Sequence, residues 1–151
     1  MSKWVLLLGG STGHGAATAK RLAKDGYGII AFHFDRGEAK KIAEETISEV
    51  NKTTGGRSHY FNINAAAEET MDKYIPQIKE ITGGEPVKLL LHSIAFGTTT
   101  NFFGEKPVTQ RQMDMTVHVM GNALLYWTQK LFAEGLLGEG SRIMGLTSEG
   151  N

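Results

Sequence analysis

The sequence predicts an α/β fold, in which a doubly wound parallel sheet is flanked by helices. Apolar runs typical of buried strands alternate with segments of helical period, and a glycine-rich turn follows the first of these runs. The chain has 151 residues, of which 40% are hydrophobic. This size suits one continuous core, so we expect a single domain over residues 1–151.

Five runs have the length and composition of strands. They cover residues 4–8, 29–34, 59–63, 87–91 and 142–147. Glycine and proline residues precede the fourth run and polar residues follow it, so we expect this strand near the centre of the sheet.

Four segments have helical periodicity. One follows the glycine-rich turn and ends near Gly26, and a second covers residues 39–50. A third, residues 68–81, contains Pro76, which lacks an amide donor and clashes with the preceding turn, so we expect a kink or a late start. The fourth, residues 113–131, has apolar residues at alternating steps of four and three, which predicts one long helix.

Charge and composition exclude several classes of partner. Lysine plus arginine and aspartate plus glutamate both number 16, so no net positive field favours nucleic acid or a membrane surface. The chain has no cysteine, which excludes disulfides, thiolate metal sites and thiol nucleophiles, and we predict no metal site. The apolar run near the start is too short for a signal sequence or a membrane span, so we expect a cytoplasmic protein.

The turn between the first strand and the first helix predicts a phosphate site. Residues 8–15 read Leu-Gly-Gly-Ser-Thr-Gly-His-Gly, and backbone amides at such a helix N-terminus can hold a pyrophosphate. Gly9 permits a tight exit from the strand, Gly13 lets the backbone approach a cofactor, and Gly15 lets the helix pack closely. A purely structural turn is the alternative.

Polar side chains near this turn are candidate cofactor ligands. Ser11, Thr12 and His14 are best placed to touch phosphates or ribose, although His14 fills a loop position equally well. Asp35 follows the second strand, where a carboxylate can accept hydrogen bonds from an adenosine ribose. Arg36 can instead meet a 2′-phosphate. A surface ion pair or a solvated turn is the alternative for these two residues.

The turn resembles the TGxxxGxG pattern of the short-chain dehydrogenase/reductase family, with Leu8 in place of the usual Thr. The resemblance implies a Rossmann-type NAD(P)-binding fold. It favours NADP(H) over NAD(H), because many NADP-using relatives have a basic residue just past the second strand, where this chain has Arg36. It also places Asn62 and Ile63 where relatives contact the adenine.

The end of the fourth strand is the most discriminating segment. Residues 92–96 read His-Ser-Ile-Ala-Phe at the carboxyl edge of the sheet, where ligands bind in such folds. Ser93 can line the nicotinamide ribose, and Ile94 with Phe96 can form an apolar wall, whereas His92 either caps the strand or acts directly. Most family members have Asn-Asn-Ala-Gly here; the segment resembles the enoyl-ACP reductase branch.

Residues 144–150 resemble the fifth-strand segment that carries the active-site serine of the family, and Ser148 is the matching residue. A structural hydroxyl is the alternative. The resemblance places the catalytic Tyr and Lys after Asn151, so we expect the chain to be the N-terminal part of a longer enzyme. Tyr126 and Lys130 have the family's Tyr-x-x-x-Lys spacing but precede the fifth strand, and we do not assign them a catalytic role.

The resemblance implies an NAD(P)H-dependent oxidoreductase, foremost an enoyl-ACP or enoyl thioester reductase of fatty acid synthesis. A 3-oxoacyl-ACP reductase or another alcohol or ketone dehydrogenase is the alternative, although Met120, which we assign to the helix core, stands where ketone-reducing relatives often have Asn. A non-catalytic nucleotide-binding fragment is the second alternative. Expected partners are an acyl thioester, with acyl carrier protein as one carrier, and further copies of the chain, because relatives associate through the long helix.

Overall fold

The computed structural model describes residues 3–148 and contains one sheet of five parallel strands. In sheet order the strands are β3 (Ser58–Asn62), β2 (Gly28–His33), β1 (Trp4–Leu8), β4 (Leu89–His92) and β5 (Arg142–Gly145). This arrangement confirms the predicted fold class. Each predicted strand is present, with some ends displaced by one or two residues, and β4 is an interior strand between β1 and β5.

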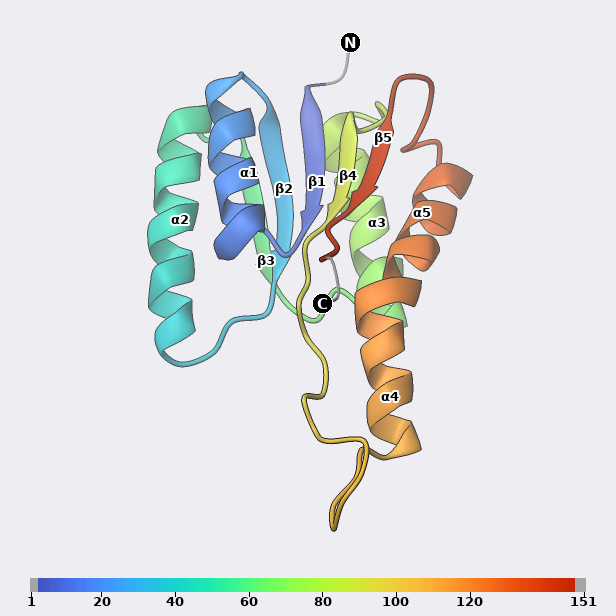
Figure 1. The fold of residues 1–151 in the computed structure, drawn as a ribbon. Coiled ribbons are helices and arrows are strands. Elements are labelled where there is room, and N and C mark those ends of the chain that lie inside the picture. Colours follow the sequence, from blue (N-terminus) through green and yellow to red (C-terminus); the bar gives the residue numbers. More distant parts are fainter. Residues whose placement is uncertain (1–2, 149–151) are drawn as a thin grey trace.

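Helices cover both faces of the sheet (Figure 1). In chain order they are α1 (Gly13–Lys24), α2 (Glu38–Thr54), α3 (Glu68–Thr82), α4 (Gln110–Val117) and α5 (Ala123–Ala133). A π-helical turn, His118–Asn122, joins α4 to α5. Within residues 3–148, no helix combines the length and the apolar content needed to cross a bilayer.

Alternating side chains of the strands build a separate core on each face of the sheet. Leu6 and Leu8 of β1 belong to the core formed with α3 and α5. Val5 and Leu7 of the same strand belong to the core formed with α1 and α2. Both faces of β1 are therefore buried, as expected for a central parallel strand.

The third helix departs from its prediction. α3 runs without a break from Glu68 to Thr82 and contains Pro76, so the predicted late start is wrong. Its inner face supplies Met71, Ile75 and Ile78 to the core. This burial stabilises the helix and offsets the loss of one backbone hydrogen bond at the proline.

The predicted long helix is present, but only part of its apolar stripe faces the core. Trp127 and Leu131 are fully buried, whereas Met120 is 47% exposed, so its assignment to the core is wrong. The π-helical turn is the physical reason, since one additional residue per turn rotates the side chains on its two sides by about 100° relative to each other. α4 also extends past the carboxyl edge of the sheet and buries none of its residues (Figure 1).

Trp127 links the long helix to the chain after β3. Its indole Nε1 donates a hydrogen bond of 2.8 Å to the carbonyl oxygen of Ala65, and both residues are buried. We predict that Trp127→Phe destabilises the protein by about 1–3 kcal/mol through the unpaired carbonyl alone. Urea unfolding measures this change. Ile42→Val on α2 is the control, because Ile42 is 57% exposed and its replacement should leave the unfolding free energy nearly unchanged.

Candidate cofactor-binding cleft

The sheet order reverses between β1 and β4, and the glycine-rich loop lies at this point. Strands β2 and β3 follow β1 on one side, while β4 and β5 lie on the other. In open parallel sheets, the crevice outside the carboxyl ends at such a switch point is where ligands bind. The structure therefore brings the segments after β1, β2, β3 and β4 to one edge (Figure 1).

Glycine is required in the loop for steric reasons. At Gly9, φ is +95°, and a Cβ there would lie 2.2 Å from the carbonyl oxygen of Ser93. At Gly15, a Cβ would lie 1.6 Å from the carbonyl oxygen of Gly9. Gly10, which the sequence analysis did not single out, meets the Cβ of Ala31 at 2.7 Å in the same test. The loop thus packs against β4, the α1 backbone and β2 at distances that exclude side chains.

The N-terminus of α1 has the properties of an anion site. Its first turn contains no acidic residue, and its first amides lack partners within the helix. The N-cap residue, Thr12, makes no capping bond with its side chain, is exposed and lines the neighbouring cleft. Backbone amides, the helix dipole and the Thr12 hydroxyl are thus available to a pyrophosphate. Gly13, with φ +54° and open space around its Cβ position, and the exposed His14 begin this helix.

A cleft of about 480 Å³ opens beside this helix end. Five residues predicted to bind the cofactor line it: Gly9, Thr12, Asp35, Ile63 and Ile94. The other lining residues are Phe32, His33, Phe34, Asn64, Ala65, Ala95, Phe96, Met115, His118 and Val119. Aromatic and aliphatic side chains dominate, with few polar groups, which is typical of a cofactor site.

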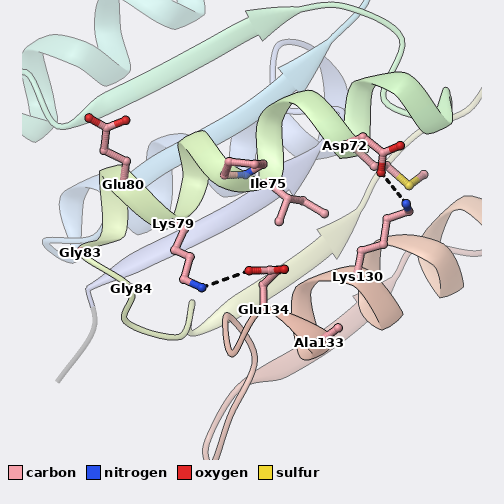
Figure 2. Close-up of a pocket in the computed structure, with 11 residues that line it drawn as sticks. Asp72, Ile75, Lys79, Glu80, Gly83, Gly84, Lys130, Ala133 and Glu134 are labelled. Atoms are coloured by element: carbon pink, nitrogen blue, oxygen red, sulfur yellow. Dashed lines mark hydrogen bonds and ion pairs between the residues drawn. The ribbon is translucent and has the colours of Figure 1, made fainter.

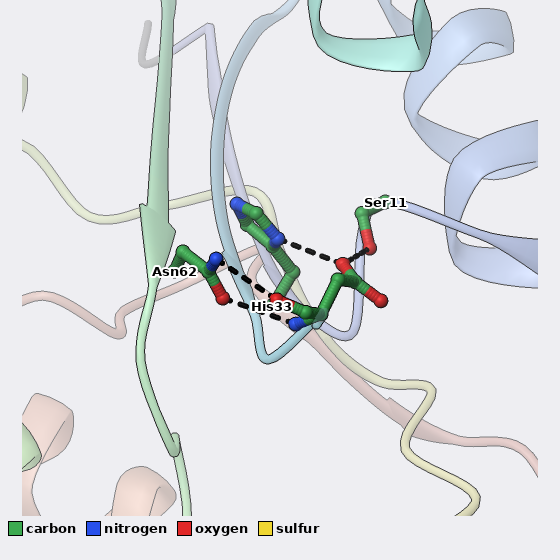
Figure 3. A network of polar contacts seen from close by, with 4 residues as sticks. Ser11, His33 and Asn62 are labelled. Atoms are coloured by element: carbon green, nitrogen blue, oxygen red, sulfur yellow. Dashed lines mark hydrogen bonds and ion pairs between the residues drawn. The ribbon is translucent and has the colours of Figure 1, made fainter. Parts of the chain in front are cut away.

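The polar end of the cleft is an ordered network around Asp35 (Figure 3). Oδ2 of Asp35 accepts a hydrogen bond of 2.5 Å from the Ser11 hydroxyl and one of 2.8 Å from Nδ1 of His33. The side-chain amide of Asn62 donates to the Asp35 carbonyl oxygen and accepts from the Asp35 amide, at 3.1 and 3.0 Å. Ser11 and Asn62 therefore act here through Asp35.

Arg36 lies outside this network. Its guanidinium carbon is 4.7 Å from the ring centroid of Phe34, which itself lines the cleft. The guanidinium thus lies against a residue of the cleft wall, and no ion pair links it to a carboxylate within residues 3–148, which leaves its donors available to an anion.

The apolar end of the cleft lies after β4. Ile94 and Phe96 line it as the predicted wall, and the backbone of Ser93 contacts Gly9. His92 is buried and its Nε2 lies 2.9 Å from the carbonyl oxygen of Val119, which favours the structural reading of this residue. His118, missed by the sequence analysis, lines the cleft and bonds through Nε2 to the Ala66 carbonyl oxygen at 2.7 Å.

Ser148 follows β5 at the same edge and is exposed, but it does not line the cleft. Its catalytic role stays a prediction. The backbone amide of Leu146 donates to the carbonyl oxygen of His92 at 3.0 Å, so the chain continues beside the end of β4.

A second, larger hollow of about 680 Å³ lies between α3 and α5, away from the glycine-rich loop. Ion pairs cross it, from Lys79 to Glu134 at 3.0 Å and from Lys130 to Asp72 at 2.5 Å (Figure 2). The Asp72 hydrogen bond raises the pKa of Lys130. With its ammonium committed to carboxylates outside the cleft, Lys130 is poorly suited to a catalytic pair with Tyr126, as the sequence analysis concluded.

Comparison with known proteins agrees with this geometry. The profile of the short chain dehydrogenase family matches residues 3–150. This chain belongs to that family. A comparison with curated proteins gives no significant match.

Several solved structures have a fold similar to that of this chain. A short-chain dehydrogenase/reductase from Serratia marcescens is 23% identical and aligns over 95% of this chain with a TM-score of 0.75. A blue fluorescent protein from a metagenomic library, in complex with NADPH, is 25% identical over 95% of this chain with a TM-score of 0.77. L-Sorbose reductase from Gluconobacter frateurii, with NADPH and L-sorbose, is 17% identical over 95% with a TM-score of 0.77.

The chain spans about half the length of these structures, namely 54%, 54% and 51% of them respectively. The shared part is the one that contains the glycine-rich loop and the cleft.

Because Gly15 contacts backbone, its replacement should disturb the loop itself. We predict that Gly15→Ala weakens NADPH binding about 100-fold or more, since a displacement of about 1 Å at a positioned group costs this much. Titration calorimetry measures the dissociation constant. Gly121→Ala is the matched control, because nothing lies within 4 Å of its Cβ position, and this variant should bind NADPH like the wild type. Equal binding by both variants would contradict the steric role of Gly15.

Proposed function

We propose that the protein to which this chain belongs is an NADP(H)-dependent reductase of enoyl thioesters. The observation that carries the proposal is the apolar wall formed by Ile94, Phe96 and Met115 beside the phosphate loop. Such a wall excludes water from a reacting acyl group, as hydride transfer requires. It also offers surface to an acyl chain, and the loop after β4 has two further exposed aromatic side chains, Phe102 and Phe103.

The bound nicotinamide supplies the hydride, and the residues of this chain hold and orient the cofactor. The amides at the start of α1 and the Thr12 hydroxyl would hold the pyrophosphate. Ile63 and Ile94 line the cleft, where they would pack against the adenine and the nicotinamide, respectively. Ser148 is proposed to hydrogen-bond the substrate carbonyl.

A ketone or alcohol reductase is the second candidate. The resemblance of residues 144–150 to the serine-bearing segment of the family favours it, as does the fold shared with L-sorbose reductase. The cleft itself distinguishes the candidates only through its apolar wall. Substrate comparison therefore decides between them.

The deciding assay follows NADPH oxidation at 340 nm by the full-length protein with crotonyl and acetoacetyl thioesters. We expect at least about tenfold higher kcat/KM for the crotonyl thioester, the ratio that about 1.4 kcal/mol of differential transition-state binding produces. Turnover of the acetoacetyl thioester alone would establish the ketone reductase instead. Binding of NADPH without turnover of either thioester would favour a non-catalytic nucleotide-binding protein.

The preference for NADP(H) is proposed from the position of Arg36. Its guanidinium stands over Phe34 at the rim of the cleft and can pair with a 2′-phosphate in bidentate geometry. We predict that Arg36→Ala weakens NADPH binding about 10- to 100-fold and leaves NADH binding unchanged. Arg57→Ala is the matched control, since Arg57 stacks on Trp4 at 5.0 Å near the amino end of β3. Equal loss of both cofactors in Arg36→Ala would refute a role in selection.

Self-association and a cytoplasmic location belong to the same proposal. Exposed apolar side chains on α5, among them Leu125 and Phe132, offer a surface to a second copy of the chain. Sedimentation analysis of the full-length protein tests this assembly.

A further inference from the structure

We propose that Asp35 is a positioning residue that holds the glycine-rich loop in place, and that it does so through the Ser11 hydroxyl. The inference rests on the proposed binding of a dinucleotide in the cleft. It assigns the carboxylate a different task from the selection between NADH and NADPH.

The first argument is the geometry of the carboxylate. Oδ2 receives both the Ser11 hydroxyl and Nδ1 of His33, so both lone pairs of this oxygen are used by the protein. Only Oδ1 is left for a ribose, and the side chain is 14% exposed. The carboxylate is thus bound through Oδ2 to two donors of the protein, whatever Oδ1 contacts.

The second argument is the number of elements that meet at Asp35. Ser11 comes from the loop after β1, His33 is the last residue of β2, and Asn62 is the last residue of β3. The side-chain amide of Asn62 bonds both the backbone amide and the carbonyl oxygen of Asp35. The amide of Ile63 donates to the His33 carbonyl oxygen at 2.7 Å. The carboxylate is therefore held by two strands and in turn holds the loop.

The third argument is the burial of Ser11. Ser11 lies between Gly10 and the N-cap residue of α1 and is 3% exposed. Its hydroxyl donates to Asp35. Removal of the carboxylate leaves the buried Ser11 hydroxyl without this acceptor, and removal of the hydroxyl leaves the carboxylate bonded to His33 alone. Either change releases the loop where Thr12 and the first α1 amides must be in position.

The proposal predicts that Ser11→Ala and Asp35→Ala have the same effect. Each should weaken NADPH and NADH binding about tenfold, with the ratio of the two dissociation constants unchanged within about threefold. The double variant should bind no more weakly than Asp35→Ala, because Asp35→Ala already removes the interaction between Ser11 and Asp35. Titration calorimetry measures all dissociation constants. Ser58→Ala, which removes a hydrogen bond of 3.0 Å to Asn51 at the opposite edge of the sheet, should bind like the wild type.

Hydrogen exchange provides a readout without any cofactor. In the cofactor-free protein, amides of residues 9–13 should exchange about tenfold faster in Ser11→Ala and in Asp35→Ala, and at the wild-type rate in Ser58→Ala. Wild-type exchange of these amides in Ser11→Ala would overturn the proposal. So would a rise in the NADPH preference of Asp35→Ala that Ser11→Ala lacks. If the wild type binds neither cofactor, the proposed function fails, and the exchange rates alone decide whether Asp35 holds the loop.

Discussion

The glycine-rich loop packs closely on three sides, twice against backbone and once against the side chains of Ala31 and Leu7, and the rest of the site depends on these contacts. A Cβ at Gly15 would collide with the carbonyl oxygen of Gly9, so glycine is needed there for the first turn of α1 to pack against the end of β1. The same Gly9 lies against the carbonyl oxygen of Ser93, which fixes the end of β4 relative to the loop. The cleft lies beyond the carboxyl ends of β1, β2, β3 and β4, and the N-cap residue of α1 lines it, at the positive end of the helix dipole. A side chain at Gly9 or Gly15 would force these segments apart.

Local sequence patterns predicted most of the fold because they coincide with the burial that the sheet imposes. The apolar run of β1 is buried on both faces, and the alternating partners Leu6 and Leu7 enter different cores. Where a local rule failed, packing overrode it. Pro76 disfavours a continuous α3. Met71 and Ile75, in the turns before the proline, bury enough apolar surface to stabilise the uninterrupted helix.

The site was predictable in its backbone and less so in its side chains. Gly9 and Gly15 follow from conformational rules that act within a few residues. The contacts of Ser11 and Asn62 with Asp35 join residues 24 and 27 positions apart, and they depend on the strand register. His33 carried a usable signal, since residues two apart at a strand end share a face. His118 carried none, because a π-helical turn leaves no mark in a 3.6-residue pattern.

The cleft changes character along its length, and this restricts which groups can supply a proton. Asp35 and His33 lie at one end, while Ile94, Phe96 and Met115 form the other. Of the titratable residues that line the cleft, His118 is the one that follows Met115 by about one helical turn. A carbonyl oxygen can only accept, so Nε2 of His118 must donate its hydrogen to Ala66. Nε2 of His118 is thus used within the protein, and only Nδ1 is left for a ligand at the apolar end of the cleft.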